Sequence, residues 1–287
     1  MRQATLGVAR FTGLIVIAAL IGGVLAACSG DGASDDLLAK VKAANKIVMS
    51  TDPEYPPQSA LAPDGTYEGF DIDVGTEIAK RLGVDISFET PSWEAITAGS
   101  WSGRWDFSVG SMTITTDREK VIAFTEPYYY TPAQMSVEAT SDIGSVADLT
   151  GQAVCVGAAT TYQQWLDGTL DFGTKTPDAA PADITVVSLN TDRNCAEAWQ
   201  AGRQDFQGWL SSSTTVQGAI DAGLPVKAIG DPVFAEPLAV AFDKSGPDPT
   251  SMVTEVNKIL DEMRSDGTLG SLSMKWFEED LTNPAGG

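Results

Sequence analysis

The chain has 287 residues, of which 43% are hydrophobic, and its 18 Lys and Arg stand against 39 Asp and Glu for a formal net charge of −21. This acidity argues against nucleic-acid binding, and the absence of histidine excludes Ser-His-Asp and Cys-His catalytic groups and His-ligated metal sites. The length permits one large or two modest domains, and the sequence predicts no metal and no cofactor.

The amino terminus has the pattern of an export signal. Arg2 and Arg10 precede a run of apolar and small residues over 11–27, which is slightly short for a membrane-spanning helix. The Leu-Ala-Ala-Cys sequence that ends at Cys28 resembles the lipobox of bacterial lipoproteins. This resemblance implies a signal peptide over 1–27, cleavage before Cys28, lipid on its sulfur, a tether over 28–35, and an extracytoplasmic protein anchored to the cell membrane. A retained signal anchor is the alternative.

The first part of the chain after this signal alternates short apolar runs with an amphipathic helix. Residues 46–50 predict a strand, and three prolines within 51–57 predict a loop. Residues 69–82 predict a helix, because apolar residues recur four apart on one face and aspartates of the cap-forming kind stand at its start. A strand over 84–88 and a weaker helix from 93 to 100 follow.

The stretch from Gly110 to Arg118 follows an apolar run over 105–109 that predicts a buried strand ending at a turn. The hydroxyls of Ser111 and Thr113, the neighbouring backbone N–H groups and the Arg118 guanidinium can converge on one small anion. A carboxylate suits this set best, because the planar guanidinium matches two carboxylate oxygens. The alternative is a strand-to-helix turn in which a hydroxyl caps the helix and Arg118 lies on the surface.

The later part of the chain again alternates strands and helices. Residues 153–156 and 184–188 predict strands, and 157–161 predict a turn into a helix. A further helix is predicted over 195–201. The apolar stripe between 252 and 263 has helical spacing and is typical of a core-facing helix.

The three cysteines divide into one and two. Once Cys28 is assigned to lipid, Cys155 and Cys195 remain as an even pair in an oxidising compartment, which favours a disulfide. Two buried free thiols are the alternative.

Residues 69–74, Gly-Phe-Asp-Ile-Asp-Val, with apolar residues at 78, 79 and 82, resemble the signature of family 3 of the extracellular solute-binding proteins, the polar amino acid receptors of ABC importers. Five further motifs occur in the family's order, and the resemblance covers about residues 38 to 280. These motifs span 52–57, 92–94, 103–106, 110–118 and 124–130.

The resemblance implies an α/β architecture, the type II periplasmic binding protein fold, in which two α/β lobes are joined by two hinge segments with a cleft between them. The first lobe is expected to comprise 36–135 plus 239–280 and the second 136–238, with 281–287 as a tail. Strand and helix signals alternate along both segments, as α/β lobes require.

The resemblance also implies which residues bind the ligand. Ser111, Thr113 and Arg118 of the first lobe and the Thr161 N–H of the second are expected to hold a carboxylate. Two aromatic residues match positions that flank the ligand side chain, although either could instead belong to the core. The predicted ligand-binding residues are Tyr55, Trp93, Gly110, Ser111, Thr113, Arg118, Thr160 and Thr161.

One position departs from the family pattern. The family has an aspartate that binds the ligand's α-ammonium, and the ungapped match here is Leu210. Three alternatives follow: Ser211 or another hydroxyl supplies the acceptor, an acid at the rim does so, or the ligand nitrogen is substituted and contacts the rings of two tryptophans. The two tryptophans would be Trp93 and Trp209. The further candidates for ligand contact are the rim acids Asp52 and Glu54, together with Met112, Trp209, Leu210 and Ser211.

The leading interpretation is a substrate-binding lipoprotein of an ABC importer, which captures a small carboxylate-bearing ligand, an amino acid or a derivative of one, and delivers it to a membrane permease. It is expected to be a monomer without enzymatic activity that binds no nucleic acid. The alternative is an exported cyclohexadienyl or arogenate dehydratase-like enzyme on the same fold, with Glu54 or Glu236 as general acid.

Overall fold

The computed structural model describes residues 35–173 and 177–283. The predicted signal peptide, Cys28, nearly all of the tether, and residues 284–287 lie outside the described residues. Among the described residues, no helix has the length and apolar character needed to cross a membrane.

The main sheet has nine strands in the order β5-β1-β6-β12-β7-β10-β8-β9, with β11 paired to β7. The β1 strand runs parallel to β5 and β6, and β8 runs parallel to β9 and β10, whereas β12 is antiparallel to both β6 and β7. The strands are β1 (Lys46–Ser50), β5 (Asp85–Glu89), β6 (Phe107–Thr113), β7 (Ile122–Glu138), β8 (Ala153–Gly157), β9 (Thr185–Leu189), β10 (Gly208–Ser212), β11 (Val226–Ala228) and β12 (Phe234–Asp243). A small antiparallel sheet holds β2 (Glu54–Tyr55), β3 (Ser59–Leu61) and β4 (Tyr67–Glu68).

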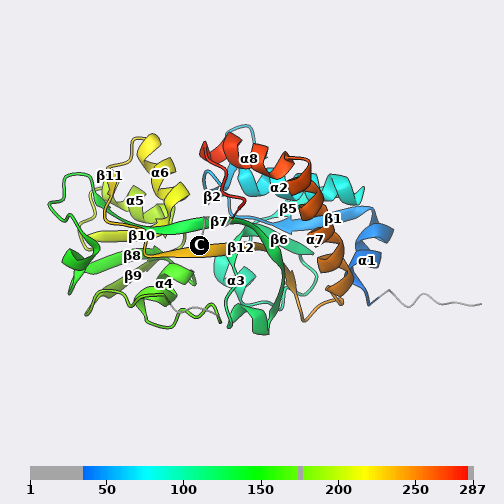
Figure 1. Cartoon of the computed structure of the whole chain (residues 1–287), viewed down its shortest axis with the longest axis horizontal. Coiled ribbons are helices and arrows are strands. Elements are labelled where there is room, and N and C mark those ends of the chain that lie inside the picture. Colours follow the sequence, from blue (N-terminus) through cyan, green and yellow to red (C-terminus); the bar gives the residue numbers. More distant parts are fainter. Residues whose placement is uncertain (1–34, 174–176, 284–287) are drawn as a thin grey trace, which may run out of the picture. The chain divides into compact units, whose positions relative to one another are not determined.

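The helices pack around these strands (Figure 1). They are α1 (Leu37–Ala44), α2 (Phe70–Leu82), α3 (Trp93–Thr97), α4 (Thr161–Leu166), α5 (Arg193–Gln200), α6 (Ser213–Asp221), α7 (Thr250–Ser265) and α8 (Thr268–Phe277), with 3-10 turns η1 (Arg118–Lys120) and η2 (Val146–Leu149). The predicted helix over 69–82 is confirmed, but its cap is different. Gly69 stands at the N-cap, and Asp71 is fully buried inside the first turn.

Buried apolar residues form separate clusters around the two halves of the main sheet. One pair of clusters packs around β1, β6 and helices α2 and α7, and the other packs around β8, β10 and helices α4 and α5. We call these the β1 side and the β8 side. The long strands β7 and β12 run through both, as Figure 1 shows. This is the predicted α/β fold class, and the lobe boundaries at 36–135 plus 239–280 and at 136–238 stay a prediction.

A disulfide joins Cys155 of β8 to Cys195 of α5, with their Cα atoms 5.8 Å apart. The predicted bridge is therefore confirmed, and the free-thiol alternative is wrong. The bridge closes a loop of 40 residues, which stabilises the fold by about 4 kcal/mol in the loop-entropy model. It fixes α5 against the sheet on the β8 side.

The strand β6 continues further than the sequence predicts. The apolar run was expected to end at a turn near Gly110, but the strand extends to Thr113, and the following turn η1 begins only at Arg118. The segment from Gly110 to Thr113 therefore belongs to the sheet and forms the last part of β6.

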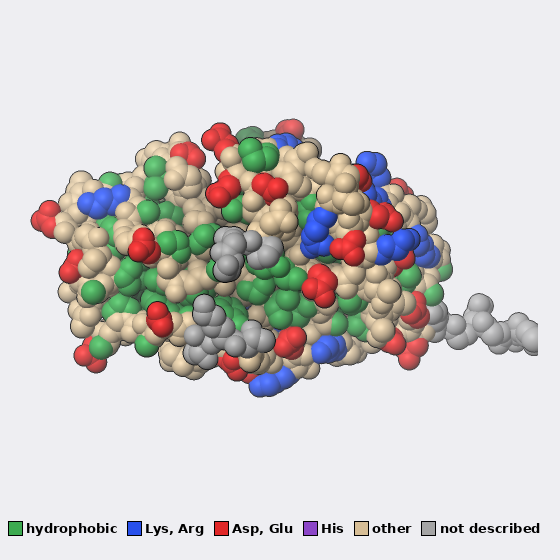
Figure 2. Space-filling model, viewed as in Figure 1, with side chains coloured by type: hydrophobic (Ala, Val, Ile, Leu, Met, Phe, Trp, Pro, Cys, Tyr) green, Lys and Arg blue, Asp and Glu red, His purple; other side chains and the backbone are tan. Residues whose placement is uncertain are grey.

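Acidic side chains are scattered over the face shown in Figure 2 and do not gather in one patch. Several lie beside Lys or Arg, as in the exposed pairs of Lys80 with Glu77 and of Arg203 with Asp205. Dispersed charge of this kind keeps a protein soluble.

Candidate ligand-binding site

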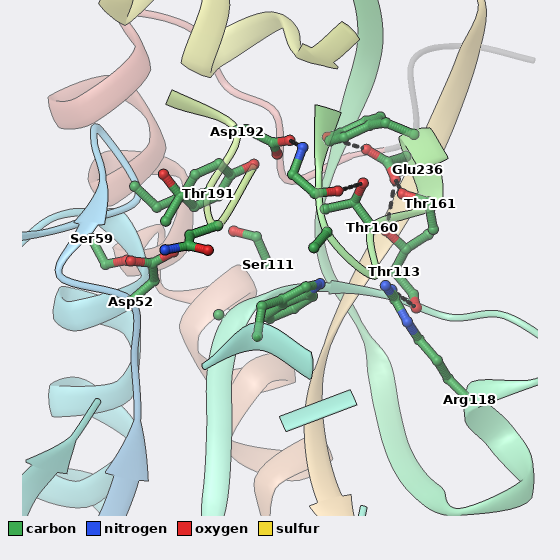
Figure 3. Close-up of a pocket in the computed structure, with 17 residues that line it drawn as sticks. Asp52, Ser59, Ser111, Thr113, Arg118, Thr160, Thr161, Thr191, Asp192 and Glu236 are labelled. Atoms are coloured by element: carbon green, nitrogen blue, oxygen red, sulfur yellow. Dashed lines mark hydrogen bonds between the residues drawn. The ribbon is translucent and has the colours of Figure 1, made fainter. Parts of the chain in front are cut away.

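A cavity lies where the β1 side meets the β8 side (Figure 3). Both sides contribute residues, and one residue comes from the crossing strand β12. The lining comprises Asp52, Tyr55, Ser59, Trp93, Gly110, Ser111, Thr113 and Arg118 from the β1 side, Gly157, Ala158, Thr160, Thr161, Tyr162, Asn190, Thr191 and Asp192 from the β8 side, and Glu236.

Arg118 links the two sides of the cavity. Its side chain is 5% exposed, and its Nη1 and Nη2 atoms donate to the carbonyl oxygens of Thr113 (3.0 Å) and Ala159 (3.1 Å). The guanidinium lies 5.4 Å from the ring centre of Trp93. Burial lowers the pKa of Arg118 to about 10, so the group stays protonated at neutral pH. A guanidinium has more N–H donors than these two, which leaves some for an anion in the cavity.

Glu236 on β12 accepts hydrogen bonds from three hydroxyls, one of which, that of Thr113, is predicted to bind a ligand carboxylate. Its Oε1 accepts from Thr113 Oγ1 at 2.7 Å and from Thr161 Oγ1, and its Oε2 accepts from the Tyr162 hydroxyl at 2.7 Å. The side chain is only 1% exposed. Burial raises the pKa of Glu236, while the three hydroxyls and the positive charge of Arg118 favour its ionised form.

Ser111 also differs from its predicted role. Its Oγ donates to Asp71 Oδ2 at 2.7 Å, and its N–H donates to the Tyr128 hydroxyl at 3.0 Å. Tyr128 in turn donates to Asp71 Oδ1 at 2.6 Å, and burial raises the pKa of Asp71 to about 7. Ser111 therefore lines the cavity, but its hydroxyl donates to the buried Asp71 and its N–H donates to Tyr128.

Asp192 brings an unpredicted carboxylate to the cavity. It follows β9, is 5% exposed, and its Oδ1 accepts from the Gly157 N–H at 2.6 Å. Burial raises the pKa of Asp192 to about 7, and the negative charges of Glu236 and Asp52 act in the same direction. A Cβ at Gly157 would lie only 2.7 Å from Asp192 Oδ1, so glycine is needed for this approach.

Asp52 stands at the opposite end of the cavity from Glu236 (Figure 3). Its Oδ1 accepts from the Glu54 N–H at 2.8 Å, as expected of a loop-capping aspartate. Burial raises the pKa of Asp52. Its second carboxylate oxygen makes it a candidate partner for a cationic ligand group.

Thr160 performs a structural task at the start of α4. Its Oγ1 accepts from the Gln163 N–H at 3.2 Å and donates to the Gly157 carbonyl at 2.8 Å. This N-cap fixes the start of the helix that carries Thr161 and Tyr162.

Three buried polar atoms of the cavity wall have no hydrogen-bond partner within residues 35–173 and 177–283. They are Ser59 Oγ, Trp93 Nε1 and Thr191 Oγ1. Because buried polar groups are usually paired, these atoms are candidates for contact with a ligand.

The structure does not bring every candidate to the cavity. Met112 is fully buried in an apolar cluster of the β1 side, and Trp209 and Leu210 are fully buried in clusters of the β8 side. Residue Ser211 is also buried and stands beside Asp192 without lining the cavity. Apolar clusters cover both faces of β10, so the side chains on each face pack into the core. Trp209 therefore cannot offer its ring to a ligand cation.

Glu54 is exposed on β2 and is not among the described residues that line the cavity. Ser212, at the end of β10, contacts two residues of the β1 side. Its Oγ lies 3.3 Å from the Tyr55 hydroxyl and accepts from Gln58 Nε2 at 3.2 Å.

Several cavity residues were not predicted, including Ser59, Tyr162, Asn190, Thr191 and Asp192. A topological signal could have found some of them. Ligands of parallel α/β sheets bind beyond the carboxyl ends of the strands, and the segments after β8 and β9 supply most of the β8 side of the wall. No group of Cys, Asp and Glu in the described residues could hold a metal ion.

The fold and this cavity define a binding protein of the type II periplasmic class. The chain superposes on the P235GK mutant of ArgBP from T. maritima with a TM-score of 0.73 at 24% identity, covering 85% of this chain and 100% of that one, which shows the fold. It also superposes on an ancestral arginine-binding protein bound to glutamine, with a TM-score of 0.70 at 27% identity, covering 82% and 99%.

The model of the bacterial extracellular solute-binding proteins, family 3, matches residues 47–279, and the chain belongs to this family. It is 31% identical to the probable amino-acid-binding protein YxeM of Bacillus subtilis (strain 168), over 94% of this chain and 96% of that protein. It is also 31% identical to the histidine-binding periplasmic protein of Salmonella typhimurium (strain LT2), over 82% and 89%. Both of these relatives are binding proteins, as is the family as a whole.

Proposed function

We propose that the chain is the substrate-binding lipoprotein of an ABC importer, and that its cavity captures an amino acid or an amino-acid derivative for delivery to a membrane permease. The protein acts as a monomer and is anchored outside the cytoplasm by lipid on Cys28. The amino-acid-binding relatives support the ligand class.

One observation carries the proposal. A buried guanidinium, Arg118, stands in a cavity whose wall comes from both sides of the sheet, and its N–H groups reach backbone atoms of each side. A ligand carboxylate bound to this guanidinium would contact residues of both sides, and these contacts form only when the two sides are close together. Such a ligand has greater affinity for the closed arrangement and stabilises it.

The acids of the cavity support an ordinary α-ammonium as the second ligand group. Leu210 offers no acceptor, but Asp192 and Asp52 both line the cavity. This favours an acid over Ser211 as the partner of the ligand nitrogen. A substituted nitrogen held by two tryptophan rings is less well supported, because Trp209 belongs to the core.

Ligand binding is tested by a thermal-shift screen of the chain from residue 29 against the common amino acids, betaines and opines, followed by titration calorimetry of every compound that raises the melting temperature. A ligand specific to the folded state raises this temperature by mass action. We expect at least one unmodified α-amino acid to bind. Binding of betaines alone would contradict the ligand assignment.

The lipid anchor is tested separately, with the full chain expressed in a bacterial host. The wild-type chain is expected in the membrane fraction, because two acyl chains anchor a protein stably. Cys28→Ser is expected in the soluble extracytoplasmic fraction, because the variant carries no acyl chain. Equal distribution of both forms would contradict lipidation of Cys28.

A further inference from the structure

We propose that Glu236 sets the charge selectivity of the cavity: it occupies the hydroxyls of Thr113, Thr161 and Tyr162 as a fixed anion, so that the cavity prefers a ligand of net positive charge to an uncharged one of the same shape. This inference rests on the proposed amino-acid-binding function and specifies the ligand within it.

The first step is that Glu236 is held as an anion. All three hydroxyls donate to it, and they occupy both carboxylate oxygens. A protonated carboxyl group would have to donate a hydrogen bond from one of these oxygens, whereas both oxygens accept hydrogen bonds here. Three donors and a nearby guanidinium in a buried place are the environment of an ionised carboxylate.

The second step is that Glu236 replaces a ligand group. Thr113 ends β6 on the β1 side, whereas Thr161 and Tyr162 begin α4 on the β8 side, and the Glu236 carboxylate bridges them. Figure 3 shows it between Thr161 and Thr113, with the Arg118 guanidinium on the same side of the cavity. The protein thus supplies its own carboxylate to the hydroxyls, and a ligand carboxylate is left with Arg118.

The third step is the charge balance. Among the described residues that line the cavity, the carboxylates of Asp52, Asp192 and Glu236 stand against the guanidinium of Arg118, so two negative charges are uncompensated when all are ionised. An amino acid with an uncharged side chain brings equal positive and negative charge and leaves this imbalance buried. A cationic side chain reduces it, and burying an uncompensated charge is costly.

The fourth step is placement. Asp52 and Asp192 are separated from Glu236 and from each other around the cavity (Figure 3). Two positive groups of one ligand, such as an α-ammonium and a side-chain cation, can therefore meet different carboxylates. Glu236 itself makes no ligand contact in this arrangement, and it acts through the charge that it adds beside Arg118.

The test compares arginine with citrulline, which has the same shape without the side-chain charge, by titration calorimetry on the chain from residue 29. Lysine, glutamine and glutamate complete the series. We expect wild type to bind arginine at least about tenfold more tightly than citrulline. In Glu236→Gln, which keeps an acceptor oxygen, we expect this ratio to fall by about tenfold.

Two further variants separate charge from structure. Glu236→Asp keeps the negative charge and is expected to keep the preference for arginine. Glu126→Gln removes the same charge from an exposed position of β7 outside the cavity and is expected to leave the ratio unchanged. Thermal melts of each variant report on folding.

The inference is overturned if wild type binds citrulline or glutamine as tightly as arginine, or if Glu236→Gln keeps the wild-type ratio. Absence of any amino-acid binding by wild type would instead refute the proposed function, on which this inference rests. Should Glu236→Gln fail to fold, proton uptake by wild type replaces it, measured by calorimetry in buffers of different ionisation enthalpy. We expect citrulline binding to take up more protons than arginine binding, and equal uptake overturns the inference.

Discussion

Glu236 Oε1 accepts a hydrogen bond of 2.7 Å from Thr113 Oγ1, although the two residues are 123 positions apart in the chain. The bond joins strand β12 to the end of β6, within the segment that the sequence identifies as a carboxylate-binding stretch. A carboxylate does lie against this threonine, but it belongs to the protein. This hydroxyl is therefore bonded within the protein, which leaves the Arg118 guanidinium as the proposed partner of a ligand anion.

Replacement of Arg118 by alanine is expected to weaken amino-acid binding by about 2–5 kcal/mol, because the variant leaves the ligand carboxylate buried without its charged partner. Arg118→Lys should restore only part of this, since an ammonium lacks the planar fork of a guanidinium. Titration calorimetry measures both. Arg203→Ala, which removes an exposed guanidinium paired with Asp205, is the control. Unchanged affinity in Arg118→Ala would contradict the assigned role.

The affinity for a cationic ligand is expected to rise with pH between about 6 and 8, because the pKa of Asp192 is about 7 without ligand. A ligand cation favours the ionised form, so binding lowers this pKa and releases a proton. The groups around Asp192 are the Gly157 N–H, the Ser211 hydroxyl and the carboxylates of Glu236 and Asp52.

Calorimetry across this pH range tests the expectation. Asp192→Asn should bind more weakly and lose most of the pH dependence, whereas Asp205→Asn, at an exposed position, should behave as wild type. A slope that is the same in Asp192→Asn and wild type would show that another group titrates.

Stability is expected to fall as the pH rises from about 4 to about 7, through the buried Asp71. Its folded pKa is raised to about 7 from an ordinary 3.8, so the folded state holds a proton that the unfolded state has already lost. The contribution is fully present below the unfolded pKa and disappears as the pH passes the folded one. Urea unfolding at pH 4.5 and 7.5 measures the difference.

Asp71→Asn should reduce this pH dependence. It should also cost about 1–3 kcal/mol of folding stability, because an amide nitrogen accepts no hydrogen bond, so one of the two donors, Ser111 or Tyr128, loses its acceptor. Asp221→Asn, at an exposed helix end, is the matched control. An unchanged slope in Asp71→Asn would place the titration elsewhere.

Gly157→Ala is expected to weaken both stability and ligand binding, because the new Cβ would lie 2.7 Å from Asp192 Oδ1 and 3.0 Å from its backbone nitrogen. The loop that carries Asp192 must then move, at a cost of about 1–3 kcal/mol for overpacking. Gly144→Ala has open space around its Cβ and serves as the control. Thermal melts with and without ligand measure the two effects, and equal behaviour of both variants would contradict the tight approach.

The fold class, most helices and strands, and Arg118 as a cavity-lining residue can be predicted from local sequence patterns. The helix Phe70–Leu82 and the strand Lys46–Ser50 have nearly the predicted bounds, because apolar periodicity and glycine signals act over a few residues. Arg118, Thr113 and Trp93 line the cavity. They could be predicted because each belongs to a short motif that can be recognised without knowledge of distant contacts. The disulfide followed from counting cysteines.

The hydrogen-bond partner of each of these side chains depends on how distant segments come together in the fold. The pairing of β12 with β6 and β7 carries Glu236 to Thr113 and to α4, and the parallel strands β8 and β9 place Asp192 beside Gly157. The tertiary structure also buried Trp209 and Leu210, since both faces of a central strand are covered. A linear pattern records the chemistry of a residue and its near neighbours, whereas a hydrogen-bond partner from a distant strand depends on how the sheet is assembled.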